Sequence, residues 1–392
     1  MPISSKILDF MDRGSWIRKM FEEGIALKKQ FGEENVFDLS LGNPVMEPPQ
    51  EFFDELKSIA SKPIKGMHRY MPNAGLEITR QAIASELNKE TGFNFSSNHI
   101  VMTCGAGGAL NVVMKTLLNQ GDEVVIFSPF FVEYQFYADN HGGSCKIVNP
   151  DENFLPDFES LFEAINKKTK AVLINSPNNP TGVMYSKEIL EKIAQIISEK
   201  EKQFDSEIFF ISDEPYRKIV FDGLEYPHIF QFHPRTIVAT SHSKDLALPG
   251  ERIGYIAVNP DYTNKDILID GLVFCNRTLG FVNAPALIQY LIVNLQSVTI
   301  DVLEYQNKRD FMYKELSSIG YETVLPQGAF YMFPKSPIKN DVEFIEILKE
   351  QNVLAVPGKG FGCSGHFRIS YCLEDSTLEG SIPGLKAAFN NI

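Results

Sequence analysis

Short apolar runs alternate with helical segments between residues 99 and 259, and this alternation constrains the fold more than any other feature of the chain. The runs read HIVMT, EVVIF, KAVLIN, EIFFIS, TIVAT and IGYIAVN. Strands separated by helical segments are typical of βα units, which build a mostly parallel sheet with helices on both faces. We therefore predict a large α/β domain of three αβα layers.

The two ends of the chain have other patterns. Residues 4–31 carry apolar side chains three and four positions apart, which indicates an amphipathic helical arm that packs on another surface. After about residue 290 a long helical segment precedes AFYMF, VLAVPG and FRISYCL, as expected for a smaller α+β domain. The predicted division is 1–44 for the arm and part of the small domain, 45–290 for the large domain and 291–392 for the small C-terminal domain.

Composition narrows the class of function. The 392 residues carry a formal net charge of −13, which disfavours nucleic acid or an anionic membrane as the main partner, because either would favour a basic surface. The five cysteines include no CxxC pair and no Cys/His metal spacing, so we expect reduced thiols and no metal. The N-terminus lacks the apolar core of a signal peptide, and no stretch reaches the length of a membrane span. We predict a cytoplasmic protein that acts on a small molecule.

A cluster of small, polar or charged residues follows each of the first five runs. CGAGGAL follows HIVMT, SPFFVEY follows EVVIF, SPNNPTG follows KAVLIN, DEPYRK follows EIFFIS and SHSK follows TIVAT. In open α/β sheets the ligand binds outside the carboxyl ends of the strands. These five clusters are therefore expected to line one crevice.

CGAGGAL has the features of an anion-binding turn. Gly105, Gly107 and Gly108 would let a ligand approach the backbone, and the helix after them would direct free N–H groups at a phosphate. A tight turn between strand and helix would explain the glycines as well, and the pattern is neither the Walker motif nor GxGxxG. Side chains that could contact the same phosphate are Ser241, Ser243 and Arg252.

Other residues of these clusters suit a planar, nitrogen-containing ring. Asp213 could keep a ring nitrogen protonated, the Tyr216 hydroxyl could contact a ring oxygen, and Phe131 could stack on the ring. Asn179 could present an amide to the ligand. Each of these four residues also has a simpler explanation: Asp213 could cap a helix, Tyr216 and Phe131 could be core residues, and Asn179 could belong to a turn. Lys244, in SHSK, taken alone is an ordinary loop lysine. A phosphate, a protonated ring, an aromatic stack and a lysine together predict pyridoxal 5′-phosphate as the cofactor.

The chain resembles the class I and II aminotransferases, which are pyridoxal-phosphate enzymes of fold type I. The resemblance rests on SLGNP, YMPNAG, TCGAGGALN, SPFFVEY, NSPNNPTG, SDEPY, SHSK, GERIGY, PQGAFYMF and FRISY, which follow one another from about residue 40 to about residue 370. It implies that Lys244 carries the cofactor covalently and that Arg252 binds its phosphate. It also implies that Asp213 pairs with the pyridine nitrogen, while Tyr216 and Asn179 contact the 3-oxygen of the ring.

The same resemblance implies the remaining contacts to the cofactor and the oligomeric state. Phe131 would stack on the ring. The phosphate cup would be completed by the backbone of Gly105, Ala106 and Gly107 with Ser241. Tyr70, in HRYMPNAG, matches a tyrosine that reaches the phosphate of the partner subunit. A homodimer with two shared sites is therefore implied.

Two arginines bear on the substrate. Arg368 matches the arginine that binds the α-carboxylate of the substrate, beside the backbone of Gly42, although alone it would suit an exposed strand position. Arg277 lies near the place where dicarboxylate-specific members carry an arginine that reaches the partner's substrate, so aspartate and glutamate are the predicted pair. An exposed or interfacial position would explain Arg277 equally well. Asp245, directly after the lysine, and Pro249 depart from the family's pattern, and an acid so close to the lysine could alter its protonation.

The implied reaction is transamination between an L-amino acid and a 2-oxo acid, with the Lys244 amine as general base. A free lysine has a pKa of about 10.4 and would stay protonated, so the site must lower that value. A β-lyase or a decarboxylase would use the same residues and stays an open alternative. A non-catalytic sensor is disfavoured, because only about forty residues precede the first motif, too few for a DNA-binding module and its linker.

Overall fold

The computed structural model describes residues 2–13, 16–62 and 64–392. Within these ranges the large sheet has seven strands: β2 (Ile100–Thr103), β3 (Glu123–Phe127), β4 (Ser144–Val148), β5 (Thr169–Asn175), β6 (Phe209–Asp213), β7 (Thr236–Ser241) and β8 (Gly254–Val258). Their spatial order is β2-β8-β7-β6-β5-β3-β4. β8 runs antiparallel to β2 and β7, whereas the other pairs are parallel. The predicted mostly parallel sheet is confirmed.

One strand of this sheet was not predicted. The six apolar runs form β2, β3, β5, β6, β7 and β8, whereas β4 has the mixed sequence SCKIV. It lies at the edge of the sheet, with Ser144, Lys146 and Ile147 exposed and Val148 buried. An edge strand with one solvent-facing side needs no continuous apolar run, so its sequence gives a weaker signal.

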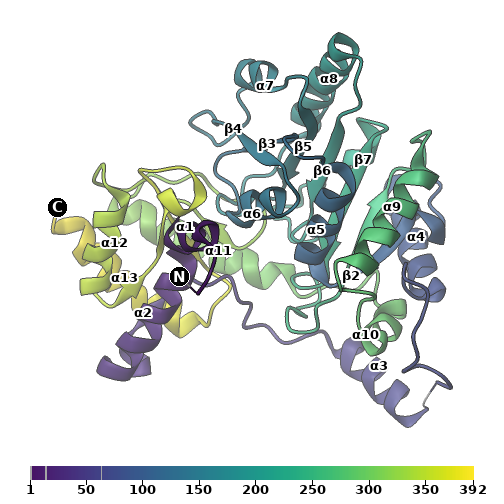
Figure 1. Ribbon diagram of the computed structural model, residues 1–392. Helices are drawn as coiled ribbons and strands as arrows, with labels where there is room; N and C mark the ends of the chain where they lie inside the picture. The colour runs from purple at the N-terminus through teal and green to yellow at the C-terminus, as the bar shows by residue number, and fades with distance from the viewer. Residues whose placement is uncertain (1, 14–15, 63) are drawn as a thin grey trace.

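Alternate residues of the strands point to opposite faces of the sheet. In β3, Val124 and Ile126 belong to one hydrophobic cluster, and Val125 and Phe127 belong to the other. The first face is covered by α5 (Gly105–Leu117), α6 (Glu133–Asn140) and α9 (Lys265–Thr278), and the second by α4 (Glu77–Thr91), α7 (Phe158–Ala164) and α8 (Lys187–Phe204) (Figure 1). Helices on both faces complete the three predicted layers.

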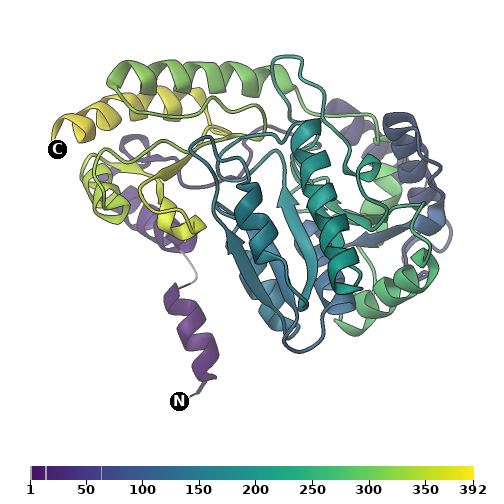
Figure 2. The ribbon, with the colours of Figure 1, turned by 90° about the horizontal axis from the view of Figure 1, so that it is seen from above.

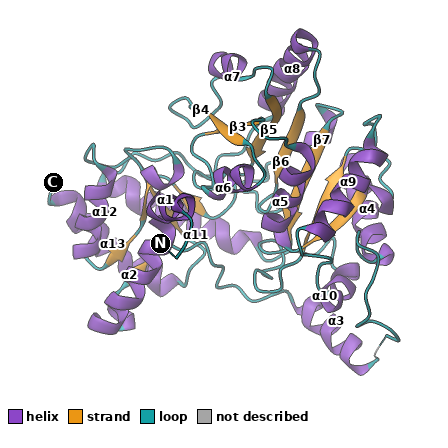
Figure 3. Ribbon diagram, viewed as in Figure 1, coloured by secondary structure: helices purple, strands orange, loops and turns teal. Residues whose placement is uncertain are grey.

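A second body lies beside the large sheet and draws on both ends of the chain (Figure 3). β1 (Phe37–Asp38) pairs in parallel with β10 (Val353–Leu354), while β11 (Val356–Pro357), β12 (Phe367–Ser370) and β9 (Tyr331–Met332) form an antiparallel sheet. The helices of this body are α2 (Trp16–Phe31), α11 (Val302–Ile319), α12 (Asp341–Glu350) and α13 (Asp375–Asn390). The domain boundaries near residues 45 and 291 stay predictions.

The helical region predicted for residues 4–31 contains α1 (Ser5–Arg13) and α2. Residues 14 and 15 lie outside the described residues. Phe10 of α1 packs on Phe136 of α6 with their ring centroids 4.9 Å apart, and α1 extends away from the second body in Figure 2. Trp16 lies against Gly360, where an added Cβ would be 3.1 Å from the Trp16 Cβ. The two helices thus contact different parts of the molecule.

The single long helix expected after residue 290 is wrong, because the chain breaks before α11. α10 (Ala286–Leu291) and the 3-10 helix η4 (Ile292–Asn294) come first. Asp301 then caps α11, because its side chain accepts a hydrogen bond from the Leu303 N–H at 2.9 Å. Between them, the Ile300 N–H donates to the Asp245 carbonyl at 2.8 Å, which ties this connection to the loop after β7.

The other elements are short or peripheral. They are α3 (Gln50–Ser61) and the 3-10 helices η1 (Glu33–Asn35), η2 (Ser97–His99), η3 (Ile229–Gln231) and η5 (Gly358–Phe361). Throughout the described ranges, every helix is too short or too polar to cross a membrane.

Candidate active site

The loops that follow β2, β3, β5, β6 and β7 meet in one cavity of about 340 Å³. These strands run parallel, so their carboxyl ends share one edge of the sheet. The cavity wall includes most of the residues predicted from the sequence: Gly42, Ala106, Gly107, Phe131, Asn179, Asp213, Tyr216, Ser241, Ser243, Lys244, Arg252 and Arg368. The expectation that five separate clusters would line one crevice is therefore met.

Lys244 reaches the cavity from the turn after β7. Its Nζ donates a hydrogen bond to the Gly42 carbonyl at 2.9 Å and lies 5.2 Å from the centre of the Phe330 ring. Burial lowers the pKa of Lys244 to about 8; the nearby Cys372 opposes this shift, and the charges of Arg368 and Arg252 add to it. A buried amine with this pKa can accept a proton near neutral pH.

Asp213 ends β6 and is buried at the floor of the cavity. The Tyr134 hydroxyl donates to its Oδ2 at 2.5 Å, whereas its Oδ1 is buried and has no hydrogen-bond partner among the described residues. Burial raises the pKa of Asp213 to about 7; the Tyr134 hydrogen bond opposes this shift, and Glu214 adds to it. A cationic N–H group of a ligand would satisfy Oδ1 and favour the ionised carboxylate.

Arg368 lies in β12 and is 2% exposed, so the surface position that its sequence context also allowed is wrong. Its Nη1 donates to the Asn179 Oδ1 at 3.0 Å, and its Nη2 donates to the Ser40 carbonyl. Its guanidinium lies 4.6 Å from the centre of the Tyr331 ring, and its Nε has no partner within the described part of the chain. A buried guanidinium without a carboxylate partner suits a carboxylate of the substrate.

The part of the cavity wall that contains Arg252 suits an anion. Helix α5 begins at Gly105 itself, so its first N–H groups face the region beside the Arg252 guanidinium. Gly105 has a φ of +73°, a backbone conformation that favours glycine, and a Cβ on it would lie 2.9 Å from the Arg252 Nη2. The Ser241 hydroxyl donates to Ser243 at 3.1 Å on the same wall.

Gly105 and Gly108, at the start of α5, do not themselves line the cavity of this chain, and neither do Tyr70 and Arg277. Tyr70 is 96% exposed. Arg277 lies in the last turn of α9, where it is exposed and its guanidinium is 5.4 Å from the centre of the Phe274 ring. Tyr70 and Arg277 were expected to act on the site of a second subunit, and both roles stay predictions.

Several residues of the cavity wall were missed in the sequence, among them Tyr134, Tyr331 and Asn175. Tyr134 and Tyr331 belong to the motifs SPFFVEY and PQGAFYMF, and Asn175 ends the run KAVLIN. The Tyr331 hydroxyl lies 3.2 Å from that of Tyr216, and the Asn175 amide donates to the Asp213 carbonyl at 2.9 Å. Their positions beside predicted clusters were the available signal, but their partners are distant in the sequence.

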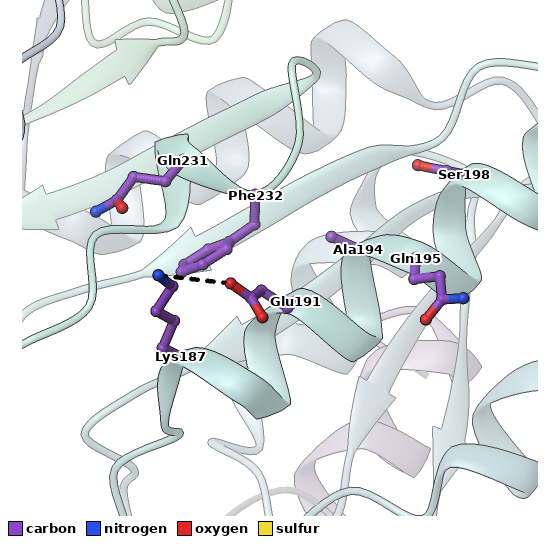
Figure 4. Close-up of a pocket in the computed structure, with 7 residues that line it drawn as sticks. All are labelled: Lys187, Glu191, Ala194, Gln195, Ser198, Gln231 and Phe232. Atoms are coloured by element: carbon purple, nitrogen blue, oxygen red, sulfur yellow. Dashed lines mark ion pairs between the residues drawn. The ribbon is translucent and has the colours of Figure 1, made fainter.

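A second hollow, on the outer face of α8, contains none of the residues predicted for the site (Figure 4). It measures about 370 Å³, and Lys187 and Glu191 form an ion pair at 3.7 Å across it. Its lining residues are Lys187, Glu191, Ala194, Gln195, Ser198, Gln231 and Phe232. The charged and amide side chains among them are exposed, so this hollow is an ordinary surface groove.

Replacing Asp213 by Asn tests the electrostatic cost of its burial in the cofactor-free protein. Because its folded-state pKa of about 7 lies above the unfolded value, the stability that Asp213 contributes is present at low pH and lost as the pH rises through 7. The neutral amide avoids this loss. We expect D213N to exceed the parent protein in free energy of unfolding at pH 8, by on the order of 2–4 kcal/mol, with a smaller difference near pH 4.

Urea unfolding at several pH values measures this difference. Asp270→Asn, at an exposed position of α9, is the matched control and should leave the free energy of unfolding unchanged at each pH. A D213N effect that does not depend on pH would contradict the assignment of a raised pKa to Asp213.

Known proteins resemble this chain over nearly its whole length. The model of the family Aminotransferase class I and II matches residues 34–382. A probable aspartate aminotransferase of Methanocaldococcus jannaschii is 34% identical over 361 residues, which cover 90% of this chain and 93% of that protein.

Solved structures agree with this match. An aminotransferase from Eubacterium rectale has a TM-score of 0.96 at 38% identity, and the match covers 100% of this chain and 99% of that one. The aspartate aminotransferase of Thermus thermophilus with maleate has a TM-score of 0.86 at 26% identity, with 99% and 100% covered. The chain belongs to the class I and II aminotransferase family.

Proposed function

We propose that the aminotransferase activity of this chain depends on pyridoxal 5′-phosphate bound in the cavity at Lys244, and that aspartate and glutamate are its amino donors. The observation that carries the proposal is the arrangement of three groups in one cavity. They are the buried Lys244 amine, the Asp213 Oδ1, which has no hydrogen-bond partner among the described residues, and the region beside the Arg252 guanidinium where α5 begins. An aldehyde, a protonated ring nitrogen and a phosphate on one molecule would satisfy all three.

Different residues would bind the phosphate, the ring nitrogen, the ring face and the 3-oxygen of the cofactor. Arg252, Ser241 and the first N–H groups of α5 would bind the phosphate. Asp213 would pair with the ring nitrogen, and Phe131 would stack on the ring. Contacts to the ring's 3-oxygen would come from Tyr216 and Asn179, and a further phosphate contact from Tyr70 of a second copy of the chain in a homodimer.

The bound cofactor supplies an electron sink for the electron pair left at the amino acid Cα when that carbon loses its proton. Lys244 is the base that takes this proton, because its amine is partly unprotonated near neutral pH. Arg368 binds the α-carboxylate and so fixes the Cα–H bond within reach of that amine. Tyr134 supports the reaction by holding the Asp213 carboxyl in place.

The substrate class rests on the relatives and on Arg277. The Methanocaldococcus and Thermus proteins are both described as aspartate aminotransferases, which supports a dicarboxylic amino donor. Arg277, exposed on α9, would bind the side-chain carboxylate of the substrate in the other subunit. A guanidinium is suited to this task because it can form two parallel hydrogen bonds with a carboxylate.

The reaction itself gives the first test. Protein loaded with pyridoxal 5′-phosphate and supplied with aspartate and 2-oxoglutarate is expected to form oxaloacetate and glutamate in equal amounts. Lys244→Ala should abolish the exchange because it removes the base. Chromatography of amino and keto acids, with parallel assays for ammonia and CO₂, measures the products. Release of ammonia or CO₂ without a new amino acid would indicate a lyase or a decarboxylase instead.

Arg277→Ala tests the substrate class. We expect the ratio of kcat/KM for aspartate to kcat/KM for leucine to fall about tenfold to hundredfold, because one charge-assisted contact is lost. Lys265→Ala, in the first turn of the same helix, is the control and should keep the ratio. An unchanged ratio in R277A would exclude Arg277 as the residue that recognises the side chain.

A further inference from the structure

Asp245 directly follows Lys244, and the reaction proposed above does not use it. Its side chain is buried, and it is the next residue in the sequence after the lysine whose amine must accept a proton. A free carboxylate near that amine would stabilise the ammonium form and so oppose its role as a base. The structure must therefore keep the two charges apart.

Some side chains of the turn after β7 line the cavity and others do not. Ser241, Ser243 and Lys244 belong to the wall of the cavity, whereas His242 and Asp245 do not. The His242 Nδ1 lies 3.1 Å from the Asp245 Oδ2, and both side chains are at most about one tenth exposed. The Lys244 amine instead contacts the Gly42 carbonyl, and no ion pair joins it to a carboxylate among the described residues.

Backbone hydrogen bonds hold the turn in this arrangement. The His242 N–H donates to the Ile253 carbonyl at 3.1 Å, and the Leu248 N–H donates to the His242 carbonyl at 3.2 Å. The Asp245 carbonyl accepts from the Ile300 N–H at 2.8 Å and from the Thr299 hydroxyl at 3.1 Å. The residues on both sides of Lys244 are thus tied to separate segments of the chain.

Side chains other than Lys244 stabilise the ionised form of Asp245. Burial by itself would raise the pKa of Asp245, but His242, followed by Lys218 and Arg217, outweighs burial and lowers it, so the group is a carboxylate. The Asp245 Oδ1 and the His242 Nε2 have no partner in the described part of the chain. The contact between His242 and Asp245 therefore sets the orientation of both side chains.

The charges that act on Lys244 belong to a different set. Burial is the largest cause of its lowered pKa, followed by the electrostatic effects of Cys372, Arg368 and Arg252, and Asp245 is not among these causes. The groups that shift the pKa of Lys244 therefore differ from those that shift the pKa of its neighbour Asp245.

We propose that His242 is a positioning residue, whose ring holds the Asp245 carboxylate away from the Lys244 amine. This inference deepens the proposed function, because it rests on Lys244 as the base. Neither residue touches the reacting atoms. The effect of His242 on the reaction passes through the protonation of Lys244.

The test measures the Lys244 amine in the full-length, cofactor-free chain. Competitive acetylation with acetic anhydride between pH 6 and pH 11, read by peptide mass spectrometry, gives the pKa of this amine in the parent protein and in each variant. His242→Leu removes the donor to Asp245, whereas His242→Asn keeps an N–H donor close to the position of Nδ1. Asp245→Asn and the double variant H242L/D245N remove the carboxylate.

The expected results differ among the variants. H242L should raise the pKa of the Lys244 amine by about one unit, because the released carboxylate can approach the ammonium group. H242N, D245N and the double variant should keep the pKa at the parent value of about 8. In the protein loaded with pyridoxal 5′-phosphate, the pH midpoint of the visible absorbance should move upward in H242L but not in the other three.

Two results would overturn the proposal: an unchanged Lys244 pKa in folded H242L, or a lower Lys244 pKa in D245N. Far-ultraviolet circular dichroism checks the folding of each variant. If H242L does not fold, the D245N variant decides. A lower Lys244 pKa in D245N would mean that Asp245 already acts on the lysine in the parent protein. An unchanged Lys244 pKa would mean that Asp245 is held away from the lysine. The acetylation assay needs no cofactor, so its result is independent of whether pyridoxal 5′-phosphate binds.

Discussion

The parallel register of β5, β6 and β7 is the constraint on which the site depends. In this register Asn175 pairs with Asp213, and Asp213 pairs with Ala239 on the neighbouring strand. The three strands therefore end together, and the loops that leave them open toward one cavity. Lys244, five residues after Ala239, reaches that cavity because β7 ends at the same edge of the sheet. A shift of one residue between these strands would turn Asp213 to the other face.

The burial of three ionisable side chains makes the chemistry of the site possible and also lowers the stability of the folded protein. Asp213, Lys244 and Arg368 are all buried, and burial acts against the charged form of each: it raises the pKa of Asp213 and lowers those of Lys244 and Arg368. The cost is reduced where a ligand brings the opposite charge or a hydrogen-bond donor. A cofactor with a cationic ring nitrogen and a substrate with a carboxylate would do so at two of the three residues. The same burial makes the Lys244 amine available as a base.

Much of the fold and site could be predicted from the sequence, because the signals involved are local. Buried parallel strands have continuous apolar sequences, and the residues directly after them must lie at one edge of the sheet, which placed Asp213 and Lys244 correctly. The edge strand β4 has a solvent-facing side and lacked that signal. The contact of Tyr134 with Asp213 joins residues 79 positions apart, and no local pattern predicts it. The roles of Tyr70 and Arg277 depend on a second subunit and so on surfaces that one chain does not define.

Reductive trapping shows whether Lys244 carries the cofactor. Protein loaded with pyridoxal 5′-phosphate is treated with sodium borohydride, digested and mapped by mass spectrometry. We expect the reduced cofactor on the peptide that contains Lys244 and none on the Lys244→Ala variant. Lys218 serves as the internal comparison, because it lies near the same turn and its pKa is also lowered by burial. Attachment at Lys218 or at another lysine, or no attachment at all, would exclude Lys244 as the residue that carries the cofactor.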